Sequence, residues 1–185
     1  MHDEDNVLME QVKNGDKTAY ETLVIKHRAQ AINFAYSFIY DLYEAEDIVQ
    51  ECFVKVYINR LEYKPSHTFK TYLFTVIRNA CIDYLRYYKK RHTVSLDDIK
   101  EISNNININP EDSAIKSERM TAIFKNLDSL QNDYKTAIYL FAIDEMTYSE
   151  IAEIMQKSIP QVKIIIHRAR TKLKKLCEGD DIFEN

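Results

Sequence analysis

The scarcity of glycine and proline is the feature of this sequence that most constrains its fold. The chain has only 2 glycines and 3 prolines among 185 residues. These two residue types mark most tight turns and strand ends, so a chain this poor in both offers few places for hairpins. Hydrophobic residues make up 45% of the chain, which is enough to bury a core. The sequence therefore predicts an all-α protein built from long helices.

Apolar residues recur at helical spacing through the first half of the chain. The pattern predicts four helices, over about residues 6–14, 16–40, 43–61 and 68–91. The pair Asn14-Gly15 favours the end of the first helix, because glycine readily adopts the left-handed conformation found there. Pro65 favours an extended residue before it, so residues 63–68 are predicted to be a loop.

The chain changes character after the fourth predicted helix. Residues 93–112 are acidic, rich in asparagine and without sustained helical periodicity, which is typical of a linker. Helical periodicity returns over residues 113–176, and residues 177–185 form an acidic tail. We therefore expect two small helical domains, 1–92 and 113–176, joined by a flexible linker.

The cysteines and the apolar runs bear on where the protein works. Cys52, Cys81 and Cys177 are odd in number and far apart, which favours reduced thiols over a disulfide framework or a zinc site. The longest apolar run, residues 137–143, is too short to cross a bilayer. We expect a soluble cytoplasmic protein with no direct membrane insertion. No glycine-rich phosphate loop and no nucleophile arrangement indicate catalysis, and no cofactor or metal is expected.

Two helix-start signals lie close together in the C-terminal half. Thr147 and Glu150 fit the capping-box pattern, and Ser158 and Gln161 fit it again eleven residues later. Pro160 stands in the first turn of the second helix, where its missing N–H costs little. Two caps at this spacing predict a short helix, a tight turn and a longer helix, which is a helix-turn-helix.

The second of these helices has two chemically different faces. The apolar side consists of Val162, Ile165, Ile166, Ala169 and Leu173. The opposite side consists of Lys163, Ile164, His167, Arg168, Thr171 and Lys174. Such a helix can pack on a small core and lie in the major groove of DNA, although a merely solvated basic face remains the alternative. Gln161 is ambiguous, because a side chain that closes the capping box is less free to contact a base.

An acidic face is predicted on the third helix. Asp47, Gln50, Glu51 and Val54 share one side by their i+3 and i+4 spacing. Three interpretations are open at this point: a metal site, a solvated acidic face, or a docking face for a basic protein partner. The metal site has little support, because no histidine stands at matching spacing and no second carboxylate helix is evident.

The fourth predicted helix interleaves aromatic and cationic residues. The aromatic ones are Phe69, Tyr72, Tyr84, Tyr87 and Tyr88. The cationic ones are Lys70, Arg78, Arg86, Lys89, Lys90 and Arg91. Aromatic rings stack on unpaired bases while cations follow the phosphate backbone, so the pattern favours single-stranded nucleic acid. The alternative is that Phe69, Tyr72 and Tyr84 belong to the core and that the last cations are a solvated helix end.

The order of these motifs resembles that of bacterial sigma factors, and most of all the compact extracytoplasmic-function (ECF) group. The resemblance rests on GDKTAY (15–20), AEDIVQECF (45–53), FKTYLFTVIRNACIDYLR (69–86) and HRAR at the end of the helix-turn-helix (167–170). It covers about residues 5–92 and 113–176. It implies a factor that binds core RNA polymerase and directs it to promoters, with no catalytic chemistry of its own.

The resemblance also implies roles for individual residues. The AEDIVQECF helix would dock on the clamp helices of the polymerase largest subunit through Asp47, Gln50, Glu51 and Val54. The minus-ten element would be melted and held by Lys64, His67, Phe69, Lys70, Tyr72, Arg78, Asn79, Arg86, Lys89, Lys90 and Arg91. The minus-thirty-five element would be contacted as duplex by Tyr148, Ser158, Gln161, Lys163, Ile164, His167, Arg168, Thr171 and Lys172.

Four positions depart from the pattern common in that family. Tyr72 stands where tryptophan is common, and Leu130-Gln131 where Leu-Pro is common. Gln156 stands in a turn that commonly has glycine, which costs roughly 1 kcal/mol if the residue is left-handed. Gln161 stands where threonine is common, so base preference there is expected to differ.

The resemblance implies partners as well. These are core RNA polymerase, promoter DNA and an anti-sigma factor, which could hold the protein at the inner face of the membrane. No stable homo-oligomer is expected, because no dimer helix is evident. Three rival functions are a helix-turn-helix regulator acting without polymerase, a sigma-mimicking adaptor, and a metal-dependent nuclease using Asp47 and Glu51.

Overall fold

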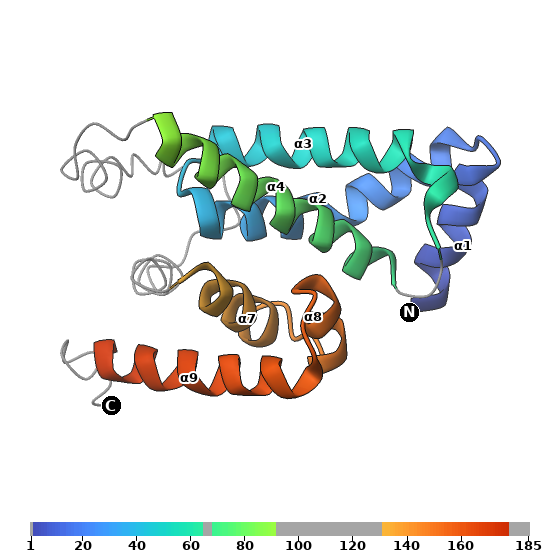
Figure 1. Ribbon diagram of the computed structural model, residues 1–185. Helices are drawn as coiled ribbons and strands as arrows, with labels where there is room; N and C mark the ends of the chain where they lie inside the picture. Colours follow the sequence, from blue (N-terminus) through green and yellow to red (C-terminus); the bar gives the residue numbers. More distant parts are fainter. Residues whose placement is uncertain (1, 65–67, 92–130, 178–185) are drawn as a thin grey trace, which may run out of the picture. The chain divides into compact units, whose positions relative to one another are not determined.

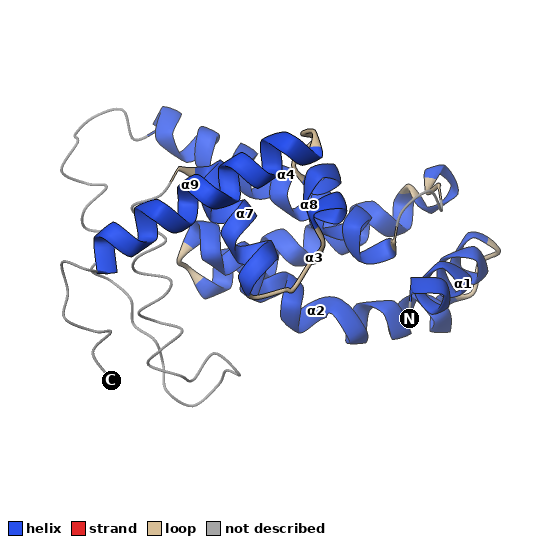
Figure 2. Ribbon diagram, turned by 90° about the horizontal axis from the view of Figure 1, so that it is seen from below, coloured by secondary structure: helices blue, strands red, loops and turns tan. Residues whose placement is uncertain are grey.

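The computed structural model describes residues 2–64, 68–91 and 131–177, and within them every regular element is a helix (Figures 1 and 2). The predicted all-α class is therefore confirmed. The chain divides into two compact units, Met1–Tyr88 and Lys89–Asn185. The predicted linker 93–112, residues 113–130 and residues 178–185 of the predicted tail lie outside the described residues.

The first unit contains four α-helices and a short 3-10 helix. Their bounds are α1 His2–Lys13, α2 Lys17–Ile39, α3 Leu42–Ile58, η1 Arg60–Glu62 and α4 Phe69–Arg91. The first helix begins earlier than predicted, and the predicted third helix is divided into α3 and η1. Helix α1 contacts α2 and η1 at one end of the unit, as Figure 1 shows.

Short polar side chains set the starts of these helices. The Asp16 carboxylate accepts from the backbone N–H groups of Thr18 and Ala19 and so caps α2. Asp41 caps α3 in the same way through the N–H of Glu44. The Thr68 hydroxyl accepts from the N–H of Thr71 at 3.1 Å and caps α4. Each such cap contributes about 0.5–2 kcal/mol to helix stability.

The core of the first unit is rich in phenylalanine. Phe34 and Phe74 are fully buried and stack with ring centroids 5.0 Å apart. Leu23 and Leu73 are also fully buried. Burying one such side chain contributes about 1.5–3 kcal/mol, so the core can hold α2 and α4 together. Cys52 and Cys81 are buried free thiols.

The second unit contains three described helices, α7 Asn132–Ala142, α8 Tyr148–Ile154 and α9 Ile159–Cys177. Helices α8 and α9 are the predicted helix-turn-helix, and α7 packs against both of them. Both predicted capping boxes are present, between Thr147 and Glu150 and between Ser158 and Gln161. Gln131 stands in an extended conformation before α7 and makes no side-chain hydrogen bond to the start of the helix.

The turn between α8 and α9 is built on a strained residue. Gln156 has φ +53°, in the left-handed region. The N–H of Gln156 donates to the carbonyl of Glu153 at 2.9 Å, and that of Lys157 donates to the carbonyl of Ala152 at 2.8 Å. This pair of bonds is the Schellman arrangement that commonly ends a helix with glycine. The prediction of a left-handed non-glycine residue at this position is therefore confirmed.

Candidate nucleic-acid interface

Helix α9 separates its side chains into an apolar and a polar face as the sequence predicts. Val162, Ile166 and Ala169 are buried against the rest of the second unit. The exposed residues are Ser158, Ile159, Pro160, Gln161, Lys163, Ile164, His167, Arg168, Arg170, Thr171, Lys172 and Lys174. Ile164 is 50% exposed among the polar residues. The exposed side of the helix is thus mainly polar beyond its first turn, with Ile164 as an apolar side chain among the polar ones.

The capping box at the start of α9 engages the side chain of Gln161. Gln161 Oε1 accepts from the backbone N–H of Ser158 at 2.9 Å and lies 3.1 Å from its hydroxyl oxygen. In return, the N–H of Gln161 donates to the Ser158 hydroxyl at 3.4 Å. The oxygen of the amide is therefore occupied within the helix. Only the amide NH₂ group remains for another partner, and it can donate but not accept.

Two cations of α9 lie over aromatic rings of its own unit. The ammonium of Lys163 is 5.6 Å from the ring centre of Tyr148, and the guanidinium of Arg170 is 4.6 Å from that of Phe141. The Phe141 and Tyr148 rings are themselves 5.3 Å apart. The structure thus brings together Lys163 and Tyr148, which were both expected to contact the minus-thirty-five element. Arg170, which was not, is held on Phe141.

The predicted docking residues of α3 line one shallow groove. Asp47, Gln50, Glu51 and Val54 are all exposed there, together with Lys55 and Ile58. Ile58 is 66% exposed and follows Val54 by four residues, and Leu61 beyond it is 72% exposed. These two residues were not predicted from the sequence, although the same i+4 spacing could have indicated Ile58. Among the described residues, no group of three or more His, Cys, Asp or Glu could hold a metal ion.

Phe69 is fully buried, which bears on its expected contact with DNA. Its ring centre lies 5.4 Å from that of His27 and 6.4 Å from that of Tyr63. A ring enclosed in this way has no surface to offer a base, so the alternative that Phe69 belongs to the core is the one that the structure has. The sequence pattern could not separate the two, because the residue starts a helix whose burial depends on α1 and α2.

Tyr72 is only half-buried and lies edge-on to Tyr63, with ring centres 5.3 Å apart at 65°. Burial and the neighbouring Glu62 raise the pKa of the Tyr72 hydroxyl. The phenol is therefore neutral at ordinary pH. Tyr72 is thus partly accessible, unlike the fully buried Phe69.

The remaining residues expected at the minus-ten element differ in exposure. Lys64, Asn79 and Arg86 are exposed, and Arg86 pairs with Asp83 at 2.9 Å. Lys70 and Arg78 are half-buried. His67 and the side chains of Lys89, Lys90 and Arg91 lie outside the description.

Tyr84 stacks on Tyr88, and burial with the nearby Glu44 raises the pKa of Tyr84 to about 12. Tyr84 is half-buried and lies near Glu44 of α3, so it is not among the fully buried core residues. Of the cysteines, burial raises the pKa of Cys52 to about 11, which makes this thiol unreactive at neutral pH.

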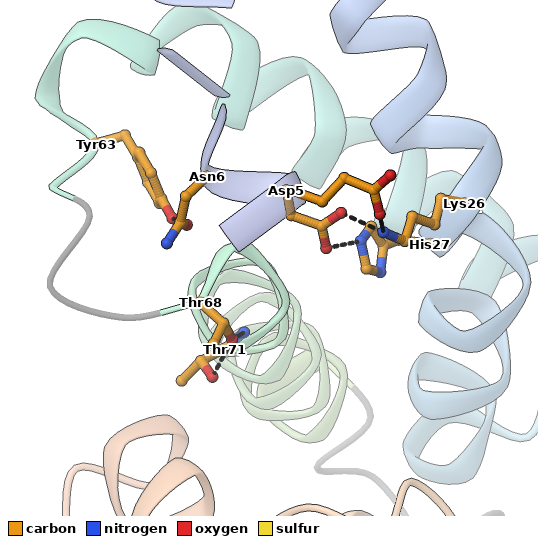
Figure 3. Close-up of polar contacts among 8 residues, drawn as sticks. Asp5, Asn6, Lys26, His27, Tyr63, Thr68 and Thr71 are labelled. Atoms are coloured by element: carbon orange, nitrogen blue, oxygen red, sulfur yellow. Dashed lines mark hydrogen bonds and ion pairs between the residues drawn. The ribbon is translucent and has the colours of Figure 1, made fainter. Parts of the chain in front are cut away.

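A buried polar cluster that the sequence did not reveal joins α1 to α2 (Figure 3). Asp5 is 7% exposed and accepts from the ammonium of Lys26. His27 is 4% exposed, and its Nε2 lies 2.9 Å from the other Asp5 oxygen. Helical periodicity does not predict this cluster, because it assigns charged residues such as Asp5 and Lys26 to the solvent-facing side of a helix.

Two family matches and one relative decide what kind of protein this is. Residues 23–91 match Sigma-70 region 2, and residues 122–173 match Sigma-70 region 4. The chain is 30% identical over 174 residues to the ECF RNA polymerase sigma factor SigW of Bacillus subtilis (strain 168), covering 90% of this chain and 93% of SigW. The protein is an ECF sigma factor. It therefore binds core RNA polymerase and directs it to promoters.

Two solved structures share the fold of this sigma factor. CnrH, in complex with the cytosolic domain of CnrY, matches with a TM-score of 0.73 and 24% identity, covering 96% of this chain and 99% of that one. The sigma factor RpoE, in complex with the anti-sigma factor NepR from Bartonella quintana, matches with a TM-score of 0.70 and 22% identity, covering 87% and 98%.

The resemblance found in the sequence is thus confirmed, and the matches favour the sigma factor over the regulator, adaptor and nuclease interpretations. Within the described residues, none of the helices is both long and apolar enough to span a membrane.

Proposed function

We propose that the sigma factor contacts its promoter through two separate surfaces and the polymerase through a third. The observation that carries this proposal is the division of α9, whose buried face is aliphatic while its exposed face is cationic and follows a capped turn. A helix of this kind fits the major groove. The minus-thirty-five surface consists of Tyr148, Ser158, Gln161, Lys163, Ile164, His167, Arg168, Thr171 and Lys172.

Individual residues of this surface suit different parts of the duplex. Arg168 is exposed and can donate to a guanine edge, which is the commonest specific contact of arginine with DNA. Ile164 can meet a thymine methyl group. The exposed start of α9 at Ser158 suits a phosphate, because helix N-termini attract anions. Gln161 keeps only hydrogen-bond donors, so it suits guanine N7 or O6, adenine N7 or thymine O4 and disfavours the cytosine amino group.

The minus-ten surface lies on α4 and the segment before it. We assign to it Lys64, His67, Lys70, Tyr72, Arg78, Asn79, Arg86, Lys89, Lys90 and Arg91, and leave out Phe69. The half-open ring of Tyr72 would stack on an unpaired base, and the exposed amide of Asn79 would bond to it. The cations would follow the backbone of the separated strand.

The docking surface for polymerase is the exposed side of α3, made of Asp47, Gln50, Glu51 and Val54 and extended by Ile58 and Leu61. Carboxylates at one end and exposed aliphatic side chains at the other suit a basic helical partner with an apolar stripe. In such an interface the apolar contacts contribute most of the affinity, while the charges speed association and fix the register.

We further propose that the protein works in the cytoplasm as a non-catalytic factor made of domains 1–92 and 113–176. Its free form binds duplex promoter weakly, because acidic segments oppose the basic surfaces and the melting surface acts on polymerase. An anti-sigma factor is proposed as a regulator, by analogy with RpoE, which was solved with one. Such a partner could hold the protein at the inner face of the membrane.

Run-off transcription tests the proposal directly. Core polymerase is incubated with a randomised promoter library, with and without the protein, and the transcribed sequences are recovered. We expect transcripts only when the protein is present. The transcribed templates should share two sequence elements, one at the minus-ten and one at the minus-thirty-five position. Promoter binding by the isolated protein as tight as by the holoenzyme would contradict the proposal, and so would transcripts without a shared upstream element.

A further inference from the structure

Helix α1 lies outside the residues matched by the region 2 family, which begin at residue 23, yet it contacts Tyr63 directly and is linked to Phe69, the first residue of α4, through His27. Asn6 makes the contact to Tyr63. Asp5 makes the contact to His27, whose ring lies against Phe69. Figure 3 shows the two neighbouring side chains of α1 reaching in these two directions.

Tyr63 is the residue through which α1 contacts the surroundings of Tyr72. It is 3% exposed, and its hydroxyl donates to Asn6 Oδ1 at 2.7 Å. The ammonium of Lys13, also on α1, lies 5.5 Å from the centre of its ring. The Tyr63 ring is thus held by α1 at its polar end and on one face. The hydrogen bond to Asn6 adds to the ring contacts that hold this buried side chain, so its loss should loosen the position of the ring.

Tyr63 in turn determines the surroundings of Tyr72. The two rings meet edge to face, 5.3 Å apart at 65°. Rings at this separation and angle attract each other beyond their shared apolar area. Tyr63 therefore covers part of Tyr72, which as a whole is half-buried. A chain of two contacts, from Asn6 to Tyr63 and from Tyr63 to Tyr72, links α1 to the proposed base-stacking residue.

A second set of contacts, from Asp5 through His27 to Phe69, holds the start of α4. The Asp5 carboxylate accepts from Lys26 and faces His27 Nε2 at 2.9 Å. The His27 ring lies 5.4 Å from the ring of Phe69, the first residue of α4. Since Tyr72 is in the first turn of that helix, the position of Phe69 also fixes the backbone from which Tyr72 projects.

We propose that Asn6 is a positioning residue for promoter melting. By holding Tyr63, it keeps the Tyr72 ring in the orientation that receives an unstacked base of the minus-ten strand. This inference rests on the proposed role of Tyr72. It adds to the proposed surface a residue of α1, which lies before the matched residues 23–91.

The test uses the full-length protein with its core polymerase. The probe is single-stranded DNA with the minus-ten non-template strand of a promoter selected from the library by the wild-type holoenzyme. Asn6→Ala and Tyr63→Phe each remove one side of the hydrogen bond. We expect each to lower the affinity for this strand by about 2- to 10-fold, as the loss of one partly buried neutral hydrogen bond allows.

Two further features separate positioning from a general loss of structure. The double variant should bind the strand no more weakly than either single variant, because both remove the same contact. Asn6→Asp keeps an acceptor oxygen for Tyr63 and should restore affinity to within about 2-fold of wild type. Gln11→Ala, an exposed position on the same helix, is the matched control and should change nothing. All variants should bind core polymerase and minus-thirty-five duplex as the wild type does.

Each outcome has a definite meaning. If Tyr72→Ala weakens strand binding and Asn6→Ala does not, Asn6 has no positioning role and the inference fails while the proposed function stands. If Tyr72→Ala leaves strand binding unchanged, the proposed role of Tyr72 fails and the inference fails with it. Equal losses in strand, duplex and core binding for Asn6→Ala would show a structural defect and also overturn the inference.

Discussion

The two units of this sigma factor hold their proposed DNA-contacting residues in different ways. In the first unit, Tyr63 is held by Asn6, 57 positions away in the sequence, and Tyr20 donates its hydroxyl proton to the carbonyl of Phe53, 33 positions away. In the second unit, the hydrogen bonds that cap the start of α9 join residues only three apart, such as Ser158 and Gln161. The proposed minus-ten surface therefore depends on bonds between distant residues, whereas the start of the helix that carries the proposed minus-thirty-five surface is set by local capping.

Because of this contrast, substitutions in the two units should differ in how far they affect stability and DNA binding together. A core change in the first unit should disturb the melting surface, because its aromatic residues are continuous with the core. Substitution of an exposed residue on α9 should alter DNA binding and leave the stability of the unit nearly unchanged, because α9 packs on the unit through its opposite face. Four measurements could break or sharpen this comparison.

The largest effect is expected from Phe69→Ala. The ring is fully buried, so its removal leaves a cavity and should lower the free energy of unfolding by about 3–5 kcal/mol. Binding of the single-stranded minus-ten DNA should fall at the same time. Urea denaturation followed by circular dichroism measures the first effect. Tyr43→Ala is the matched control, because that ring is 82% exposed, and should change stability by less than about 0.5 kcal/mol. A stable Phe69→Ala variant would contradict the link between core and surface.

A smaller and purely local effect is expected from Arg168→Ala. It should weaken minus-thirty-five duplex binding by the holoenzyme by about 1–3 kcal/mol and relax base preference at one position if Arg168 contacts a base edge. Arg170→Ala is the control on the same helix, since its guanidinium lies over Phe141. Fluorescence anisotropy at several salt concentrations distinguishes the two kinds of contact. A uniform loss across sequences with a smaller salt slope would mean that Arg168 contacts phosphate only.

Acidification should affect the first unit through His27. Burial lowers the pKa of His27, against the opposing influence of its hydrogen bond to Asp5, while Lys26 and Lys70 lower it further. Its Nδ1 atom is buried with no hydrogen-bond partner among the described residues, so a proton there would gain nothing. The neutral ring is thus the form that folding favours.

The sign of the pH dependence follows from that shift. The contribution of His27 is fully present above its unfolded pKa of about 6.5 and is lost as pH falls below it, by at most about 1.4 kcal/mol per pH unit. Urea unfolding from pH 7.5 to 5.5, compared between wild type and His27→Gln, measures it. The wild type should lose more stability on acidification than the variant. Parallel pH profiles, or a wild type that gains on the variant in acid, would refute the assignment.

The smallest effect is expected in the turn of the second unit. Gln156→Gly should raise the stability of that unit by about 1 kcal/mol, because glycine adopts the left-handed conformation without the strain of a side chain. Gln156→Ala is the control, since alanine keeps the strain, and should give no such gain. Hydrogen exchange of amides in α8 and α9 reports on this unit alone. Equal protection in both variants would show that the turn carries no strain.

The same contrast explains what the sequence could predict. Thr147, Glu150, Ser158 and Gln161 were recognised because capping acts over three residues, and the structure has both boxes. The long helices followed from the scarcity of glycine and proline. Local patterns of this kind need no knowledge of the fold.

The features that the sequence could not predict depend on contacts between distant residues. Phe69 has an aromatic side chain beside cations, and only its packing against His27 and Tyr63 makes it core. Asp5 and Asn6 look like ordinary surface residues at the start of the chain until the fold brings Lys26, His27 and Tyr63 to them.

The occupied oxygen of Gln161 has a consequence for how promoter preference can diverge. A mutation at position 161 changes a proposed DNA contact and a helix cap together, so most new base preferences there would start from a less stable turn, by about 0.5–2 kcal/mol. Relaxing the strain at Gln156 would provide a compensating gain of similar size. Lineages that alter their minus-thirty-five specificity through position 161 should therefore tend to acquire glycine at position 156 first, which makes the order of the two substitutions matter.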